Sequence, residues 1–202
     1  MKNTILLYFI FLSGVAWSQT VKVTNSFGSS NPEIQELMDF QKIYVEKFNL
    51  ESTDLAGKNW EIYVSEYLDG KLTDKILLGE TSKADFLKIK YSPFSIKFFT
   101  QIKAGTLTIN AKFYNFTIKT LHLKLSGKSK EDDYVLKDFF GSKLTMEVPM
   151  AEEIPLLAII TPTRHKDGSG SYCEVVQSDI KPEELGKHFN IPHYFLVTMK
   201  IK

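Results

Sequence analysis

Apolar and polar residues alternate most regularly in the stretch from Pro93 to Leu125. From Leu107 to Phe113 every second residue is apolar, and the residues between them are polar. A period of two fits a pleated strand with one buried face, because successive strand side chains point to opposite faces. The pattern therefore predicts a β-sheet, to which the rest of the chain adds strands or short helices.

Two turn signals predict hairpins in this sheet. Asp69-Gly70 lies within alternating residues of the segment Trp60–Gly79. A type I′ turn needs positive φ at both central residues, and Asp-Gly adopts it readily. A second turn, Lys103–Gly105, predicts another hairpin inside the central stretch.

After Phe113 the alternation changes phase twice, near Tyr114-Asn115 and near Lys119-Thr120. A shift of one residue would turn every following side chain to the other face. The chain must therefore turn or bulge at these points. A tight hairpin at Tyr114-Asn115 and one long bulged strand both satisfy the pattern, and both give an antiparallel sheet.

One helix is predicted after Asn31, which competes with Ser30 as the N-cap. Apolar residues three and four apart follow in Pro32–Phe40, as in a one-sided helix of about two turns. We expect a strand from there to Leu50. A continuous helix to Phe48 is the alternative, because the apolar stripe continues that far.

Further strands are expected at Leu156–Ile160, which suits burial on both faces, and at Tyr194–Ile201. A second short helix is expected, capped by Asp179 or Ser178, with Pro182 near its first turn. Eight or more short strands and two short helices predict a mainly β fold. The expected architecture is an antiparallel β-sandwich or a sandwich-like α+β fold.

Residues 1–18 have the order of a secretory signal peptide. Lys2 precedes an apolar run, and Ala16 and Ser18 occupy the small-residue positions of a cleavage site before Gln19. An N-terminal membrane anchor or a buried first helix is the alternative. We expect export to the periplasm or the extracellular space, and a single β-rich domain over residues 19–202. No transmembrane segment is expected in the mature chain.

Charge and cysteine content restrict the partners. The chain has 25 basic and 24 acidic residues, which give a net charge of +1 and no basic patch that predicts nucleic-acid binding. The lysines of Lys112–Lys130 alternate with apolar residues, as on the outer face of a strand; an anion-binding strip is the alternative. Cys173 is the only cysteine, so it is either a buried apolar residue or a free thiol.

Common catalytic motifs are absent from the sequence. It has no GxxxxGK or GxGxxG phosphate-binding loop, no GxSxG nucleophile elbow and no HExxH metal motif. No cofactor is therefore predicted.

The most unusual polar segment is the loop Thr161–Tyr172, which contains Arg164, His165 and Asp167. Long loops often carry function, so these three side chains are candidate ligand-binding residues. Two aromatic candidates, Tyr63 and Tyr67, lie on the strand face opposite Trp60 and would stack on a sugar ring if exposed.

The C-terminal region also offers weak candidates for metal binding or nucleophilic catalysis. They are His188, His193 and Cys173 as metal ligands, or Cys173 paired with a histidine. In the alternative interpretation His165 lies in a loop, His188 faces solvent near a helix end and His193 begins the last strand.

The segments AWSQ (Ala16–Gln19), GKNW (Gly57–Trp60) and EYLDGKL (Glu66–Leu72) resemble those of short exported β-rich proteins of gut and marine Gram-negative bacteria. The resemblance implies no catalytic residue. We expect a non-enzymatic exported module that binds a protein partner, a glycan or the cell envelope. The alternative is a hydrolase or metal-dependent enzyme that uses the Thr161–Tyr172 loop.

Overall fold

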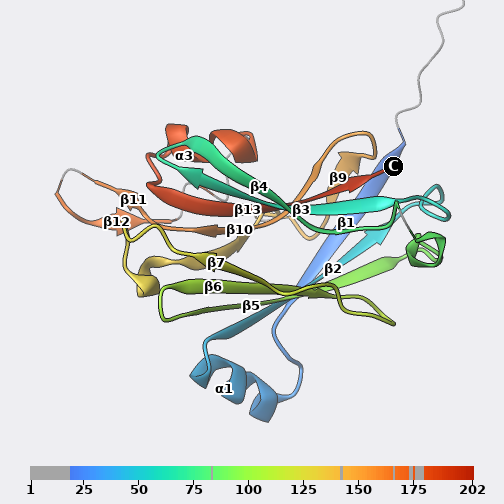
Figure 1. Cartoon of the computed structure of the whole chain (residues 1–202), viewed down its shortest axis with the longest axis horizontal. Helices are drawn as coiled ribbons and strands as arrows, with labels where there is room; N and C mark the ends of the chain where they lie inside the picture. The colour runs from blue at the N-terminus through green and yellow to red at the C-terminus, as the bar shows by residue number, and fades with distance from the viewer. Residues whose placement is uncertain (1–18, 83, 142, 166, 173–174, 176–179) are drawn as a thin grey trace, which may run out of the picture.

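The fold is a β-sandwich, in which two antiparallel sheets stack face to face (Figure 1). The computed structural model describes residues 19–202, except residues 83, 142, 166, 173–174 and 176–179. The mainly β fold and the sandwich architecture expected from the sequence are confirmed. The predicted signal peptide, residues 1–18, lies outside the described residues.

Sheet A has six strands in the order β7-β6-β5-β2-β1-β9. Their bounds are β1 Thr20–Phe27, β2 Ile43–Glu51, β5 Phe94–Lys103, β6 Thr106–Lys112, β7 Leu121–Lys124 and β9 Met146–Pro149. Sheet B has five strands in the order β4-β3-β13-β10-β8. Their bounds are β3 Trp60–Leu68, β4 Lys71–Glu80, β8 Val135–Asp138, β10 Ile154–Ile160 and β13 His193–Ile201.

Shorter elements connect and cover the two sheets. A separate small hairpin consists of β11, Thr163–Arg164, and β12, Gly170–Ser171. Among the described residues, the helices are α1 Pro32–Phe40 and α3 Leu185–His188, and the 3₁₀ helices are η1 Asp85–Leu87, η2 Glu131–Asp133 and η3 Pro182–Glu184.

The two predicted hairpins are present. Asp69 and Gly70 have φ of 50° and 70°, as a type I′ turn requires, and they join β3 to β4. Ala104 and Gly105 have φ of 52° and 70° and join β5 to β6. Local turn chemistry therefore fixes where both hairpins begin. The β5–β6 register then continues without a shift, whereas the β3–β4 register shifts at Glu66/Tyr67 and at Ile62/Tyr63.

The tight turn after Phe113 is also present, and the long bulged strand is excluded. The backbone N–H of Phe113 donates to the carbonyl of Phe116 at 2.8 Å. The N–H of Ile118 then donates to the carbonyl of Ala111 at 3.0 Å, so the chain runs back along β6 before β7 begins.

Helix α1 ends before β2 begins, which confirms the helix–strand prediction and excludes the continuous helix. The Asn31 side chain caps α1, because its Oδ1 accepts from the N–H groups of Glu33 and Ile34 at 3.0 and 3.3 Å. Lys42 has a φ of 53°, which takes the chain out of the helix and into the first residue of β2.

The main core lies between the two sheets. Phe48 and Phe98 come from sheet A and Ile62 from sheet B, and all three side chains are fully buried. Trp60 stacks on Phe113 with 4.7 Å between the ring centroids. Aromatic residues thus supply much of the apolar area that stabilises the sandwich.

A second core covers the outer face of sheet B. Tyr67 of β3 stacks on Tyr194 of β13, with ring centroids 4.5 Å apart and planes 5° apart. Leu185 and Ile191, from α3 and the loop after it, pack over these rings. Both faces of β13 are therefore buried, which the alternating sequence of this strand did not predict.

Candidate functional site

Two polar side chains of the Thr161–Tyr172 loop, those of His165 and Asp167, bond to serines of the same loop. His165 Nε2 lies 2.9 Å from Ser171 Oγ. Asp167 Oδ1 accepts from the N–H and the hydroxyl of Ser169 at 3.0 and 2.7 Å, and these bonds lower the pKa of Asp167. Such bonds order the β11–β12 turn.

Two predicted site residues of this region are described only in part. Arg164 contributes its backbone to β11, and its side chain lies outside the described part of the structure. Cys173 lies outside the described residues altogether. Within the described residues, no cluster of three or more His, Cys, Asp and Glu side chains is arranged to hold a metal ion.

The remaining histidine candidates lie in different environments. His188 is exposed at the end of α3, with its ring 4.7 Å from the ring of Phe189. His193, at the start of β13, is 0% exposed. His188 therefore faces solvent near a helix end and His193 begins the last strand, as one of the two sequence interpretations predicted.

His193 is the centre of a buried hydrogen-bonded chain. Its Nε2 lies 2.9 Å from Glu66 Oε1, and its Nδ1 lies 2.5 Å from the hydroxyl of Tyr134. A carboxylate only accepts, so the imidazole donates through Nε2–H to Glu66 and accepts from Tyr134 through Nδ1. These hydrogen bonds join β3, β13 and the segment before β8 at one end of the sandwich.

The hydrogen bonds among Tyr134, His193 and Glu66 form a buried network. Burial lowers the pKa of His193, and the neighbouring Glu66 opposes that shift. Both ring nitrogens are engaged in hydrogen bonds, and the His193 side chain is 0% exposed. Sequence reasoning missed the network, because its members are 59 and 127 residues apart along the chain.

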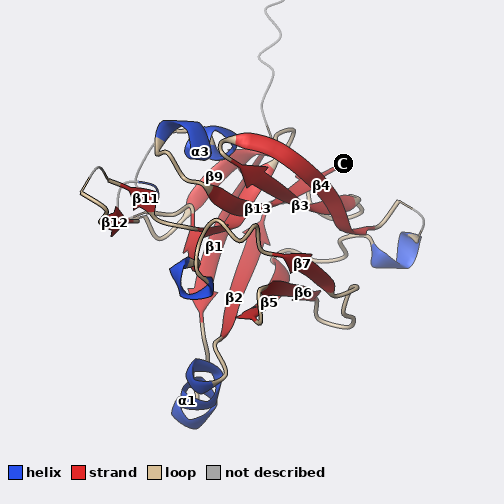
Figure 2. Cartoon of the chain, turned by 60° about the vertical axis from the view of Figure 1, so that its left-hand side comes forward, coloured by secondary structure: helices blue, strands red, loops and turns tan. Residues whose placement is uncertain are grey.

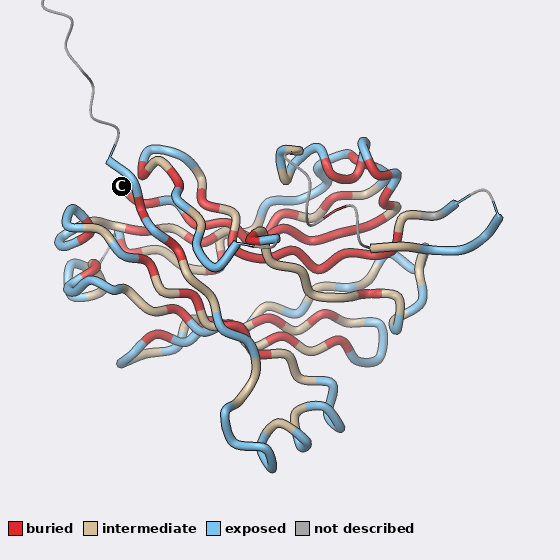
Figure 3. The backbone as a smooth tube through the Cα atoms, turned by 180° about the vertical axis from the view of Figure 1, so that it is seen from behind, coloured by how far each residue is buried: buried red, intermediate tan, exposed pale blue. Residues whose placement is uncertain are grey.

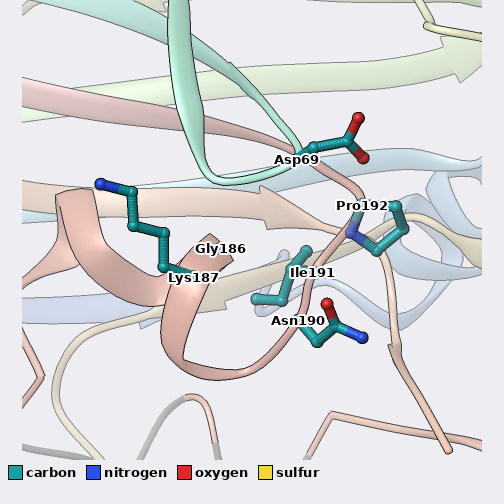
Figure 4. Close-up of a pocket in the computed structure, with 6 residues that line it drawn as sticks. All are labelled: Asp69, Gly186, Lys187, Asn190, Ile191 and Pro192. Carbon is teal, nitrogen blue, oxygen red and sulfur yellow. The ribbon is translucent and has the colours of Figure 1, made fainter.

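A pocket of 320 Å³ lies next to this network, between the β3–β4 turn and α3 (Figure 4). Its lining residues are Asp69, Gly186, Lys187, Asn190, Ile191 and Pro192. In Figure 4 the Asp69 carboxylate and the Lys187 amine point in different directions, and the carboxylate also pairs with Lys128. The pocket therefore lacks the convergent polar groups expected of a specific small-molecule site.

The two aromatic candidates are not equally accessible. Tyr63 is half-buried on the outer face of sheet B, where its hydroxyl donates to Glu61 Oε2 at 3.0 Å and the Lys75 amine lies 4.7 Å from its ring centroid. Tyr67 lies on the same face but is buried beneath α3, and burial raises its pKa to about 12. Only Tyr63 offers part of its ring to a ligand.

Helix α1 is the least expected feature of the surface. It projects from the end of β2, beyond the two sheets (Figures 1 and 2). None of its residues is buried: Ile34 is 50%, Leu37 61% and Phe40 81% exposed. Figure 3 shows the same helix in the colours of exposed and intermediate residues. Surface helices normally turn such an apolar face toward the core.

Polar contacts hold α1 in this orientation. Gln35 Oε1 accepts from the Ser29 N–H at 2.8 Å, and its Nε2 donates to Asp39 Oδ1 at 2.7 Å. Gln35 also lies against Gly28, where a Cβ atom would be 2.3 Å from its Oε1. The helix therefore contacts the body of the protein through Gln35, and Ile34 and Leu37 stay in water.

A pocket of 370 Å³ continues this surface at the C-terminal end of α1. Phe40 and Ile102 supply its apolar lining, and its other lining residues are Gln41, Lys42, Lys103 and Glu131. We call α1 and this pocket together the α1 surface. Sequence reasoning found the apolar stripe of α1 but missed its exposure, because a stripe specifies a face and not the neighbour that covers it.

Comparison with family models, with curated proteins and with solved structures gave no significant match to this chain. Among the described residues, no helix combines the length and the apolar content needed to cross a membrane.

Proposed function

We propose that this chain is an exported, non-enzymatic binding module that attaches to a protein partner through the α1 surface. The observation that carries the proposal is the exposed apolar side of α1, formed by Ile34, Leu37 and Phe40. A grouped set of exposed apolar side chains marks an interaction site more often than isolated ones do. Export is supported by the signal-peptide pattern of residues 1–18.

The chemistry of α1 defines the partner. An amphipathic helix binds by inserting side chains three and four positions apart into an apolar groove. Ile34 and Leu37 have this spacing, and Phe40 continues it into the 370 Å³ pocket. The partner therefore presents a complementary apolar groove.

The charges of α1 add a second condition. Glu33, Glu36 and Asp39 are its only charged residues. Lysine or arginine side chains at the rim of the groove would complement them. The same carboxylates disfavour an anionic lipid surface, which attracts basic segments.

The test uses site-specific photo-crosslinking in the producing cell. A crosslinking amino acid replaces Leu37 in one variant and the 95% exposed Tyr114, in the β6–β7 turn, in the control. We expect a discrete protein adduct from position 37 only. The adduct protein is then purified, and we expect Leu37→Ser to weaken its binding to the full chain by about tenfold or more.

Three outcomes would contradict the proposal. Adducts of equal yield from positions 37 and 114 would show non-selective contact. A purified adduct protein that binds the Leu37→Ser chain as tightly as the unaltered chain would exclude α1 as the contact. Adducts made only with lipid would replace the protein partner with a membrane.

A further inference from the structure

Three lysines form a row across the outer face of sheet A. Lys47 of β2 lies directly opposite Lys97 of β5, which lies directly opposite Lys112 of β6. The next residues along β2 and β5, Phe48 and Phe98, face the main core and are fully buried. The three lysines therefore point to the solvent side of the sheet.

This row is electrostatically unfavourable by itself. Neighbouring strands are about 4.8 Å apart, and like charges directly opposite each other destabilise a sheet. Among the described residues, none of the three amines forms an ion pair. On the same face Lys22 of β1 does pair with the cross-strand Glu51, at 3.8 Å.

The residues beside the row do not supply the missing negative charge. One neighbouring row contains Thr24, Asn49 and Ser95, and the other contains Val45, Phe99 and Asn110. All six are uncharged. A ligand that covers Lys47, Lys97 and Lys112 would therefore meet three amines and no opposing carboxylate in the adjacent rows.

We propose that the Lys47–Lys97–Lys112 row binds a linear anionic polysaccharide, which lies across strands β2, β5 and β6. The amines follow a line with a repeat of about 5 Å, so successive acid groups of an extended chain can each approach one of them. Lysine binds carboxylate or sulfate as a point charge and does not require the two-pronged geometry that arginine imposes. This surface is distinct from the α1 surface and takes a different class of ligand.

A nucleic acid fits the row less well. Proteins that bind single strands combine cationic side chains with aromatic rings on which bases stack. Lys47, Lys97 and Lys112 have only Ser26 and Thr117 as further neighbours in their own row. No ring lies between the three amines, and the Phe99 ring in the adjacent row is half-buried. The row therefore favours acid groups over bases.

The experiment measures binding of the purified full chain to three immobilised probes: dextran sulfate, polygalacturonate and neutral dextran. The test variant replaces Lys47, Lys97 and Lys112 with glutamine. A control variant has glutamine in place of three exposed lysines on the sheet B side, and it loses as much positive charge as the test variant. These lysines are Lys71, Lys181 and Lys200.

We expect the unaltered chain to bind both acidic polymers and not neutral dextran. The row variant should lose about tenfold or more in affinity, and the slope of log K against log salt should fall by about two to three. The control variant should lose less than about threefold, because only long-range attraction is reduced. Lys97→Gln alone should weaken binding by about threefold.

The proposal is overturned if the row variant and the control variant lose affinity equally, because net charge alone would then explain binding. It is also overturned if the unaltered chain binds neither acidic polymer. A thirty-nucleotide oligothymidylate serves as a further probe. If it binds as tightly as the acidic polysaccharides or more tightly, and the row variant loses this binding, the row is assigned to nucleic acid instead. These results do not depend on α1, so they are separable from the crosslinking at position 37.

Discussion

Gly186 of α3 and Gly70 of the β3–β4 turn lie backbone against backbone. A Cβ atom on Gly186 would be 2.8 Å from the Cα of Gly70 and 2.8 Å from Cε1 of Tyr194. A Cβ atom on Gly70 would in turn be 2.9 Å from the backbone nitrogen of Lys187. This close approach allows α3 to cover the stacked rings of Tyr67 and Tyr194.

We expect Gly186→Ala to destabilise the fold, although alanine normally stabilises a helix by about 1 kcal/mol relative to glycine. The added methyl group would meet the backbone of Gly70 and the ring of Tyr194, and neither can move without separating α3 from sheet B. Overpacking of this kind costs about 1–3 kcal/mol. The free energy of unfolding, measured by urea denaturation at pH 7.5, checks the sign.

Gly105→Ala is the matched control for this substitution. Nothing lies within 4 Å of a Cβ atom at Gly105, so its alanine variant reports only the strain of a residue with a φ of 70°. A Gly186→Ala protein that is more stable than the unaltered chain would show that the contact between α3 and the β3–β4 turn is looser than described.

Gly70 takes part in one feature that the sequence could predict, its turn, and in one that it could not, its contact with Gly186. The Asp69-Gly70 turn depends on the φ of two adjacent residues, so the dipeptide alone predicted it. The contact of Gly70 with Gly186 joins positions more than 100 residues apart, and no local pattern specifies it. For the same reason the sequence predicted that Tyr67 lies on the strand face opposite Trp60, but not that α3 buries it.

Of the candidate site, too, the sequence predicted the local features and not the contacts with the rest of the protein. The apolar spacing of Ile34 and Leu37 predicted α1 correctly. The sequence left Ser30 and Asn31 as alternative N-caps, and the structure has Asn31. Gln35, and not the apolar stripe, contacts Gly28 and Ser29. Composition and periodicity contain no information on this contact.

The exposure of α1 predicts an unusual tolerance to substitution. Leu37→Ser should change the free energy of unfolding by less than about 0.5 kcal/mol, because the leucine side chain is mostly in water. Leu157→Ser is the buried counterpart, and it should cost at least about 2–5 kcal/mol. Comparable losses from both substitutions, in guanidinium denaturation, would mean that Leu37 packs against the protein in solution.

The hydroxyl of Tyr134 should contribute measurably to stability. Tyr134→Phe removes the donor to His193 Nδ1 and leaves a buried acceptor unpaired, which costs about 1–3 kcal/mol. Tyr63→Phe removes a similar bond from a more exposed position and should cost less than about 1 kcal/mol. Thermal unfolding at pH 7.5 would rank the two variants, and equal midpoints would argue against a buried Tyr134–His193 bond.

A buried carboxyl group makes stability depend on pH. Glu46, on the core side of β2, is 5% exposed, and its Oε2 has no hydrogen-bond partner among the described residues. Burial and the charge of Asp138 raise the pKa of Glu46 to about 7. Asp138 itself is well bonded, because it accepts from Asn25 Nδ2 at 2.8 Å and from the Phe140 N–H at 3.0 Å.

The sign of the effect follows from proton binding. Between the ordinary carboxyl pKa of 4.5 and the raised value of about 7, the folded chain binds more protons at Glu46 than the unfolded chain does. Stability from this group is therefore complete below pH 4.5 and is lost as the pH rises to about 7, by an amount on the order of 3 kcal/mol.

Glu46→Gln should remove this loss, because the amide stays neutral at every pH. We expect the variant to be more stable than the unaltered chain at pH 8 and close to it at pH 4.5. The difference in free energy of unfolding between the two chains, measured by urea denaturation from pH 4 to pH 9, cancels the titration of the other groups, including His193. A constant difference across this range would show that Glu46 remains ionised in the folded protein.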